Sequence, residues 1–468
     1  MSGTGLVRMS EGDLGGFCDL RRQQVGARLL AAMRDAPTMC LNALAEDRNE
    51  SRRFGRFLAN RSVSRDEMLV HAGLLTGQRA AGRHVLAIQD TTELHFPGQA
   101  TRKRGFGTGG NGQGVGLFLH PAIAVDAANR GVIGLVGVQV INRTGGPVGH
   151  RHARDAGDKE SRRWLAAAET AAAVLDQAAM VTVVGDRESD VYDLFARRPL
   201  ALHLLCRAAQ DRCLDTGLDT GARLFATVAA WPEQDRYVVE VPGRGAVPAR
   251  SAAVAVRFGQ VTLQRPKRAS RKLAQAVTLR VVDVAEIDPP NPKEAMHWYL
   301  LTTHDVPDLA QARTVVGWHQ ARWTIEQVFR TLKSAGAEVE ASQVVEAASF
   351  IKLAIVALIA AVRIVQIVMA RDGSTGQALS DAADPADTDL LQALSAKLEG
   401  RTALLKNPYG CTTLAWFAWI VARLGGWAGY TSKGYKPPGP KIIARGLTKL
   451  DAITDGWHLN HSAHVRLP

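Results

Sequence analysis

Cysteine is scarce in this sequence, and its scarcity excludes two kinds of small, cross-linked scaffold. Of 468 residues only five are cysteines, an odd number, and no two of them form a CxxC pair. A disulfide framework needs paired cysteines, and a zinc ribbon needs them at metal-ligand spacing. We therefore expect a protein of a reducing compartment, and the cytoplasm is the predicted location.

Long apolar runs are also missing, which argues against a membrane protein. The longest run, Leu353 to Val368, contains Arg363 and Gln366 and is shorter than the roughly 20 residues that cross a bilayer. The N-terminal segment carries charge and glycine ahead of any apolar run, unlike a secretory signal peptide. The sequence therefore predicts no membrane partner and no export.

Acidic residues are in deficit, and the excess of positive charge indicates a polyanionic partner. Lysine and arginine number 57 and aspartate and glutamate 45, which leaves a formal net charge of +12. Such a charge attracts polyanions, of which nucleic acid is the first candidate. Hydrophobic residues make up 46% of the chain, so its length suffices for two or three domains with cores of their own.

The sequence pattern changes along the chain from helical to strand-like. Residues 1–75 read as basic helices, either a phosphate-contacting module or a solvated helix face. Residues 76–370 begin with the β-branched runs HVLAIQD, VGLFLHPAIAVD and GVIGLVGVQVIN, followed by a helix at about 159–178, the strand VTVVGD and a helix near 191–196. Three adjacent strands, a helix, a strand and a helix are the element order of a ribonuclease-H-like α/β core.

Two more regions complete this division. Strand-like runs without a comparable helix fill residues 205–303, which we interpret as a β-rich insertion in the core. A Gly-, Ser- and Asp-rich segment at 372–388 reads as a linker, within a helical C-terminal region that covers residues 371–468. The apolar stretch TTLAWFAWIVARLGGW in that region predicts a helix with a protein partner, and a second copy of this chain is the first choice.

The stretch Trp318–Lys333 combines charged and apolar residues in a regular pattern. No proline or glycine interrupts it, so the sequence predicts a single helix. At about 100° per residue, four polar side chains form one stripe along the edge of the buried face: His319, Arg322, Glu326 and Lys333. Taken alone, the stretch reads as an amphipathic surface helix with an Arg-to-Glu pair at i,i+4.

Two aspartates distant in the sequence give Glu326 a second interpretation. Asp90 ends the first predicted strand and Asp186 ends the fourth, and a ribonuclease-H-like sheet would bring those strand ends side by side. The three carboxylates together could hold two magnesium ions, one activating water or a 3′-hydroxyl and one stabilising the leaving oxygen. Each aspartate alone would be a turn residue or helix cap, so this prediction depends on the triple.

Other carboxylates compete for these positions. Glu93, Asp126, Glu188 and Asp190 lie near the same predicted strand ends, and spacing alone does not exclude Glu188. We prefer Asp186 because it stands at the strand terminus, whereas Glu188 and Asp190 belong to the following turn and cap.

Three further signals are weaker. GTGGNG at 107–112 matches the glycine pattern of dinucleotide sites, but a strand-like run follows where a helix should begin. His150 and His152 lack partner ligands at zinc spacing and read as part of a solvated loop. Trp298 in MHWYLL is either a core aromatic or a platform for an unstacked base.

Taken together, these residues resemble a known family. Asp90, Asp186 and the motif Arg-x₃-Glu-x₆-Lys around Glu326 are similar to bacterial insertion-sequence DDE transposases of the insertion-sequence-four family, which includes the transposase of the kanamycin-resistance composite transposon. The resemblance covers nearly the whole chain, including RFLANRSVS, QDTT, KESRRWLAAA, GDRES, HWYLLT, RWTIEQVFRTLKSAGAE and ARLGGW. The family signature begins with tyrosine where this chain has His319, whose ring can still donate to a phosphate oxygen.

The resemblance implies cut-and-paste DNA transposition that depends on two Mg²⁺ ions, with Mn²⁺ as an alternative. It implies that Asp90, Asp186 and Glu326 are the metal ligands. It also implies DNA contacts, in which Trp298 would stack on a base flipped out during hairpin formation. The other contacts would hold phosphates near the transposon end: Arg207, His319, Arg322 and Lys333.

The implied partners are double-stranded DNA, as terminal inverted repeats and as target, and a second subunit in a synaptic homodimer. Residues 1–75 would bind the end DNA and residues 371–468 would form the dimer contact, in the bacterial cytoplasm at the nucleoid. Each subunit would nick one end, form and reopen a hairpin, and join the 3′ end to target DNA. Two alternatives remain open: a DNA-binding regulator of transposition that does not cut, and a nuclease without strand transfer.

Overall fold

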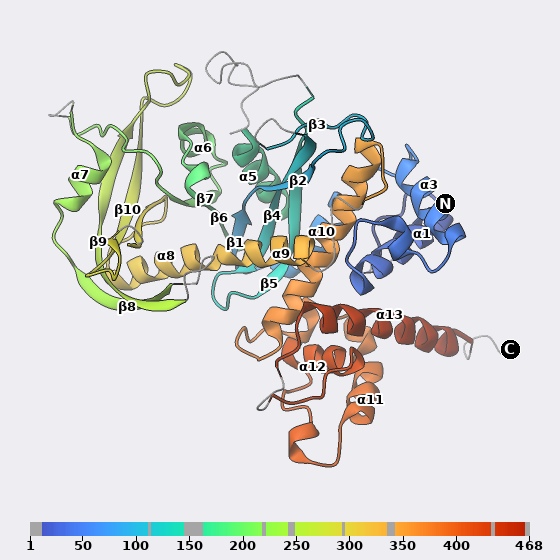
Figure 1. The fold of residues 1–468 in the computed structure, drawn as a ribbon. Coiled ribbons are helices and arrows are strands. Elements are labelled where there is room, and N and C mark those ends of the chain that lie inside the picture. Colours follow the sequence, from blue (N-terminus) through green and yellow to red (C-terminus); the bar gives the residue numbers. More distant parts are fainter. Residues whose placement is uncertain are drawn as a thin grey trace, which may run out of the picture.

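A mixed β-sheet runs through the chain and carries helices on both faces (Figure 1). The computed structural model describes residues 12–110, 114–144, 162–217, 221–241, 249–292, 295–334, 342–431 and 436–463. Within these residues eleven strands join in one sheet: β1 (His84–Gln89), β2 (Thr92–Phe96), β3 (Gly107–Thr108), β4 (Val115–Asp126), β5 (Val132–Ile141), β6 (Met180–Gly185), β7 (Leu202–Arg207), β8 (Asp235–Val241), β9 (Arg250–Gln264), β10 (Ala276–Glu286) and β11 (His297–Thr302).

The α-helices of the described residues lie before, between and after these strands. They are α1 (Leu20–Asp35), α2 (Leu41–Leu44), α3 (Arg48–Ala59), α4 (Arg65–Ala80), α5 (Arg162–Val174), α6 (Tyr192–Arg197), α7 (Leu224–Ala229), α8 (Leu309–Ala321), α9 (Trp323–Ser334), α10 (Ala347–Ala370), α11 (Thr388–Leu398), α12 (Leu414–Leu424) and α13 (Pro440–Ala463). The predicted α/β class is confirmed. His150, His152 and Gly112, which the sequence singled out, lie outside the described residues.

Five strands form the centre of the sheet in the order β5-β4-β1-β6-β7. Strand β4 is antiparallel to both β5 and β1, whereas β1, β6 and β7 are parallel to one another. In β1, Leu86 and Ile88 belong to the hydrophobic cluster of α8, α9 and α10, and Val85 and Ala87 belong to the cluster of α5 on the other face. A strand buried on both faces has a continuous apolar sequence, as HVLAIQ has, and the predicted strand at this position is confirmed.

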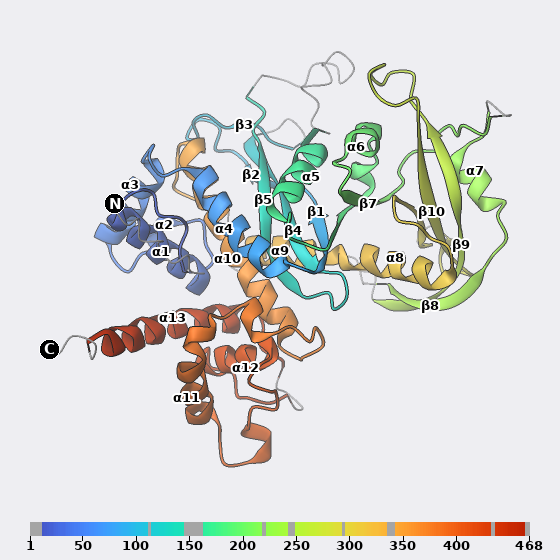
Figure 2. The same cartoon turned by 180° about the vertical axis from the view of Figure 1, so that it is seen from behind.

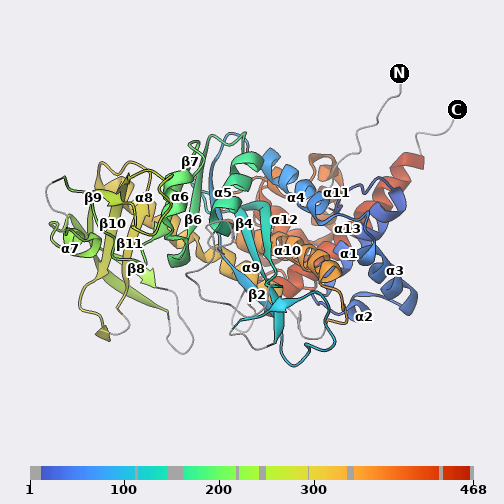
Figure 3. The ribbon, with the colours of Figure 1, turned by 90° about the horizontal axis from the view of Figure 1, so that it is seen from above.

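The β-rich segment predicted between residues 205 and 303 is confirmed, but it continues the core sheet. Strand β11 pairs antiparallel with β7 through Leu300, Leu301 and Thr302, and the sheet then extends through β10 and β9 to β8. Figure 3 shows these strands at one end of the molecule and the N-terminal helices at the other. The insertion is therefore attached to the core by backbone hydrogen bonds.

Helix α10 packs between the sheet and the flanking helices. By length and composition it could cross a membrane, but 78% of its apolar window is buried inside the chain, as in a core helix. It extends well beyond the apolar run Leu353–Val368 that the sequence suggested. Arg363 Nη1 donates to Gln366 Oε1 at 2.8 Å, so the two polar residues that interrupt the run satisfy each other inside the core.

The segment predicted to be a linker, residues 372–388, is packed instead. Asp381 is 2% exposed, and its carboxylate pairs with Arg83 Nη2 at 2.6 Å. Gln366 Nε2 also donates to the Asp381 carbonyl oxygen at 2.9 Å. The C-terminal region is thus joined to the core by buried polar contacts, which composition alone did not indicate.

Helix α12 carries the apolar stretch that predicted a protein partner. Its aromatic residues Trp416, Phe417 and Trp419 are buried in a cluster with residues of α10, α11 and α13. Gly446 allows the close approach of α13, because a Cβ there would collide with the carbonyl oxygen of Val421. The apolar face is therefore covered from within the chain, and it gives no reason to expect a second copy. Helix α13 itself extends away from α12 (Figure 2).

A cluster of histidines lies at the edge of the sheet where β1, β6 and β7 begin. The rings of His203 and His304 stack, with centroids 3.9 Å apart. Thr182 Oγ1 lies 2.7 Å from His304 Nε2 and 2.8 Å from His84 Nε2. Burial, together with His203 and His84, lowers the pKa of His304 to about 3. The cluster is therefore neutral at physiological pH.

We expect acidification to destabilise the fold through this cluster. The unfolded chain protonates His304 near its ordinary pKa, whereas the folded chain does not, so its stabilising contribution is complete above about pH 6.5 and decreases toward pH 3. Between about pH 7 and pH 5 the loss amounts to about 2 kcal/mol. In thermal denaturation followed by circular dichroism, His304→Gln should lose less of its melting temperature over this interval than the wild type. Equal losses would contradict this role.

Candidate active site

Two aspartates stand next to each other where adjacent parallel strands end. Asp90 follows β1 and Asp186 follows β6. The parallel register pairs Ile88 with Val184, and its continuation places Asp90 opposite Asp186. The predicted juxtaposition of these strand ends is therefore confirmed.

The proximity of the two aspartates changes the acidity of Asp90. Burial, followed by repulsion from Asp186, raises the pKa of Asp90 to about 6, and Glu326 adds to the rise. The Thr91 amide donates to Asp90 Oδ1 at 2.7 Å, and this bond and Arg322 act in the opposite direction. A buried carboxylate next to a second one, with a raised pKa, is typical of a functional site.

Glu326 reaches this pair of aspartates through Arg322. Arg322 Nη1 lies 3.1 Å from Asp90 Oδ2, and Arg322 Nη2 lies 2.9 Å from Glu326 Oε1. All three side chains are largely buried. The exposed fractions are 20% for Asp90, 12% for Arg322 and 33% for Glu326. The guanidinium therefore occupies the space between the two carboxylates and neutralises part of their charge.

The prediction of one unbroken helix over Trp318–Lys333 is wrong at one residue. Helix α8 ends at Ala321 and α9 begins at Trp323. Between them the Arg322 amide donates to the carbonyl oxygen of His319 at 3.1 Å, three residues back instead of four. The break coincides with the residue whose side chain bridges Asp90 and Glu326, and the backbone of Arg322 itself stays in the right-handed helical region.

The carboxylates fit a hard divalent cation by their chemistry. Asp90, Asp186 and Glu326 offer only oxygen ligands, as Mg²⁺ prefers, and burial, followed by Asp186, raises the pKa of Asp90. In the described part of the chain, however, no three His, Cys, Asp or Glu side chains are grouped closely enough to hold a metal. The reason is the position of Arg322 between Asp90 and Glu326.

Three basic side chains meet beside the carboxylates. Arg207 ends β7, and its Nη2 donates to the His297 carbonyl oxygen of β11 at 2.7 Å. Burial, and then the neighbouring charges of Arg187 and Arg322, lower the pKa of Arg207. Such a concentration of guanidinium groups favours binding of a phosphate chain. Arg187 was not singled out from the sequence, although its place directly after Asp186 could have indicated it.

Lys333 lies at the far end of α9 from this arginine group. Its side chain is exposed, and desolvation lowers its pKa while the carboxylate of Glu93 opposes the change. Glu93 also accepts a hydrogen bond from the Gly110 amide. Lys333 therefore borders the strand ends near β2 and is open to a ligand.

His319 and Trp298 were predicted to contact DNA, and both are buried. They are 6% and 8% exposed, and their rings meet edge to face with centroids 5.2 Å apart. Burial, with Arg322 and Arg207, lowers the pKa of His319 to about 3, and its Nδ1 has no hydrogen-bond partner among the described residues. The packing of α8 on β11 covers both rings, so either contact with DNA would require this packing to open.

The competing carboxylates have other partners. Asp190 forms a buried ion pair with Arg212 at 2.6 Å, and Asp126 accepts from the Ala128 amide in a turn at the opposite edge of the sheet. Glu188 pairs with Arg163 at 2.6 Å. The preference for Asp186 over Asp126 and Asp190 thus agrees with their contacts.

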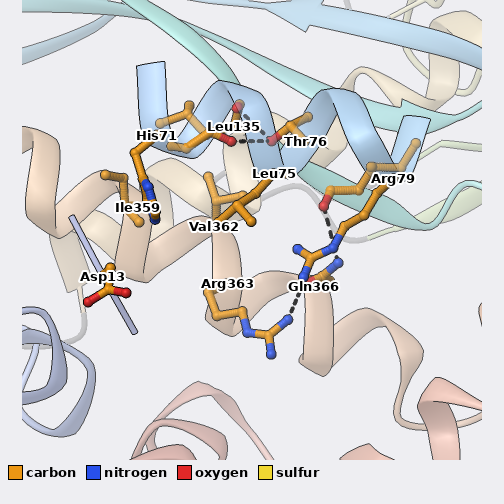
Figure 4. A pocket seen from close by; sticks show the side chains of 13 residues that line it. Asp13, His71, Leu75, Thr76, Arg79, Leu135, Ile359, Val362, Arg363 and Gln366 are labelled. Atoms are coloured by element: carbon orange, nitrogen blue, oxygen red, sulfur yellow. Dashed lines mark hydrogen bonds between the residues drawn. The ribbon is translucent and has the colours of Figure 1, made fainter. Parts of the chain in front are cut away.

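A pocket between α4, β5 and α10 lies at the other edge of the sheet (Figure 4). The side chains that line it include His71, Thr76, Arg79, Arg363 and Gln366. Thr76 Oγ1 donates to the Leu135 carbonyl oxygen at 2.8 Å. None of the predicted site residues lines this pocket, so it is separate from the carboxylates.

We expect removal of the bridging guanidinium to raise the pKa of Asp90 above its value of about 6, because Arg322 favours the charged carboxylate. The titration of Asp90 can be followed by NMR of protein with ¹³C-labelled aspartate carboxyls in the presence of a chelator, with Asp90→Asn to assign the signal. Arg322→Ala should move the midpoint upward. Arg330→Ala removes an equal charge from an exposed position of α9 and should leave it in place. An unchanged midpoint in Arg322→Ala would refute the bridge.

Comparison of the chain with models of protein families finds no match. The candidate site thus consists of two neighbouring strand-end aspartates, a glutamate joined to one of them by an arginine, and a group of arginines beside them.

Proposed function

We propose that this chain is a divalent-metal-dependent DDE transposase, which cuts DNA at the ends of a mobile element and joins the 3′ ends to a target. One observation carries the proposal: Asp90 and Asp186 stand opposite each other at parallel strand ends, and Arg322 connects Asp90 to Glu326. Three carboxylates from two strands and a helix are the ligands that two-metal phosphoryl transfer uses.

The strand order supports a ribonuclease-H-like core. Three neighbouring strands of the sheet, β1, β4 and β5, form an antiparallel unit, and β6 and β7 are then added in parallel on the other side of β1. Helix α5 precedes β6 and α6 precedes β7. The short strands β2 and β3 lie outside this plan and pair only with β4.

The proposed cofactor is Mg²⁺, as two ions, with Mn²⁺ as an alternative. Asp90, Asp186 and Glu326 would hold it, and when bound it would supply an activated water or 3′-hydroxyl and a stabilised leaving oxygen. In the absence of the cofactor, Arg322 acts as the counter-ion of Asp90 and Glu326. Once the carboxylates are neutralised, its guanidinium can bind a DNA phosphate, for which its planar fork is suited.

The proposed partner is double-stranded DNA. Arg187, Arg207 and Arg322 would hold phosphates beside the scissile bond, and Lys333 would extend this contact along α9. In the N-terminal region, α3 exposes Arg52, Arg53 and Arg56 on the side away from its buried aromatic residues. Arg28 is not part of that surface, because it pairs with Glu50 at 2.8 Å and Glu46 at 2.6 Å.

A second subunit is proposed for the synaptic complex that holds both transposon ends. The apolar face of α12 is covered, so the contact between copies must use other surfaces. The proposed location is the bacterial cytoplasm, at the nucleoid.

The decisive experiment uses the purified protein, Mg²⁺ and DNA that carries the inverted repeats flanking its gene. Cutting followed by insertion supports a transposase, and cutting alone indicates a nuclease. Binding without cutting indicates a regulator, which the occupation of the carboxylates by Arg322 would favour. In this assay Asp90→Ala, Asp186→Ala and Glu326→Ala should bind the ends but not cut. Glu169→Ala, an exposed carboxylate of α5, should cut normally. Unimpaired cutting by any of the three would remove the basis of the assignment.

A second prediction concerns the basic face of α3. Replacement of Arg52, Arg53 and Arg56 by alanine should weaken DNA binding, and it should flatten the plot of log affinity against log salt by about 0.9 for each phosphate contact removed. Fluorescence anisotropy of a labelled duplex over a potassium chloride series measures both quantities. A control variant removes three equal charges from exposed positions of the C-terminal region and should keep the wild-type slope: Lys397, Arg401 and Lys441 to alanine.

A further inference from the structure

Arg163 connects the two loops that carry the strand-end aspartates. It lies in the first turn of α5, which packs on the sheet through Trp164, Leu165 and Ala168. Its side chain is 12% exposed. Arg163 Nε donates to Thr91 Oγ1 at 3.0 Å, and Nη2 donates to Glu188 Oε2 at 2.6 Å.

The two partners of Arg163 are the residues that hold the aspartates. The Thr91 amide donates to Asp90 Oδ1 at 2.7 Å. The Glu188 amide donates to Asp186 Oδ1 at 2.8 Å. Arg163 therefore binds the side chains of Thr91 and Glu188. The main-chain amides of the same two residues orient the carboxylates of the aspartates.

The bond to Thr91 is fixed from its other side as well. Thr91 Oγ1 lies 2.9 Å from His120 Nδ1, and His120 is fully buried. Burial, and then Arg163, lower the pKa of His120 to about 3, so the ring is neutral and carries one proton. The Thr91 hydroxyl is thus held between Arg163 and His120.

The ion pair with Glu188 contributes little to the stability of the fold. Glu188 is 63% exposed, and exposed ion pairs contribute roughly 0–1 kcal/mol. Stability therefore does not explain why Arg163 contacts both loops. The relative position of the loops that it fixes is a better explanation. Its planar guanidinium holds two partners at a fixed separation, which a flexible lysine cannot do.

We propose that Arg163 is a positioning residue, which ties the Asp90 loop to the Asp186 loop so that both carboxylates face one divalent cation. The inference rests on the proposed metal-dependent function, because it concerns how the ligands are arranged. Residues that orient metal ligands typically change metal affinity about 10–100-fold when they are removed.

The test uses the full chain and Mn²⁺ alone, without DNA, with binding measured by isothermal titration calorimetry and by the electron paramagnetic resonance of free Mn²⁺. Arg163→Ala should weaken Mn²⁺ binding about tenfold, while its melting temperature stays close to that of the wild type. Arg163→Lys, which can reach only one partner at a time, should recover part of the affinity. Arg162→Ala removes the same charge from the exposed neighbouring position of α5 and should bind as the wild type does.

The outcomes separate the positioning role from the proposed function. If the wild type does not bind Mn²⁺, or if Asp90→Ala binds it equally well, the proposed metal-dependent function is wrong. The inference about Arg163 is then wrong as well. If the wild type binds and Arg163→Ala binds equally well, only the inference is overturned. If Arg162→Ala weakens binding as much as Arg163→Ala, the effect is one of net charge and the inference is again overturned.

A second pair of variants keeps the test decisive should Arg163→Ala fail to fold. Thr91→Val removes the hydroxyl and preserves the shape, and Glu188→Gln removes the charge and keeps an acceptor. Each should weaken Mn²⁺ binding, and the double variant should lose less than the product of the two single losses, because both act through one guanidinium. Wild-type affinity in both single variants would overturn the inference.

Discussion

The fold brings two negative charges together by its hydrogen-bonded backbone. Parallel pairing of β1 with β6 sets Asp90 opposite Asp186, and the register of the strands leaves no freedom to separate them. Like charges at this spacing must be neutralised, protonated or shared with a cation. In this chain burial, and then repulsion from Asp186, raise the pKa of Asp90. Arg322 lies 3.1 Å from the Asp90 carboxylate and opposes this rise.

Much of the site could be predicted from sequence because it depends on local patterns. An apolar run that ends in aspartate predicts a buried strand with a carboxylate at its tip, as for Asp90 and Asp186, and helical periodicity placed Arg322 and Glu326 on one face. The bridge made by Arg322 could not be predicted in this way, because it requires the distance between α9 and β1. The same holds for Arg163, whose importance comes from Thr91 and Glu188 on two other elements.

Composition was less informative about the boundaries between regions. The segment around Asp381 has the polar residues of a linker, yet its carboxylate is buried against Arg83. Apolar α12 suggested an external partner, and its partners turned out to be α10, α11 and α13. The insertion has strand-like sequence throughout, which does not reveal that β11 joins the core at β7. In each case the sequence does not show which other part of the same chain packs against the segment.

The pairing of β7 with β11 joins the insertion to the strand that carries Arg207. Leu300, Leu301 and Thr302 pair across it. Next to this pairing, Trp298 contacts His319, and Arg207 donates to the His297 carbonyl oxygen. The position of β11 is therefore coupled to two residues beside Arg322, because His319 and Arg207 both contact this strand.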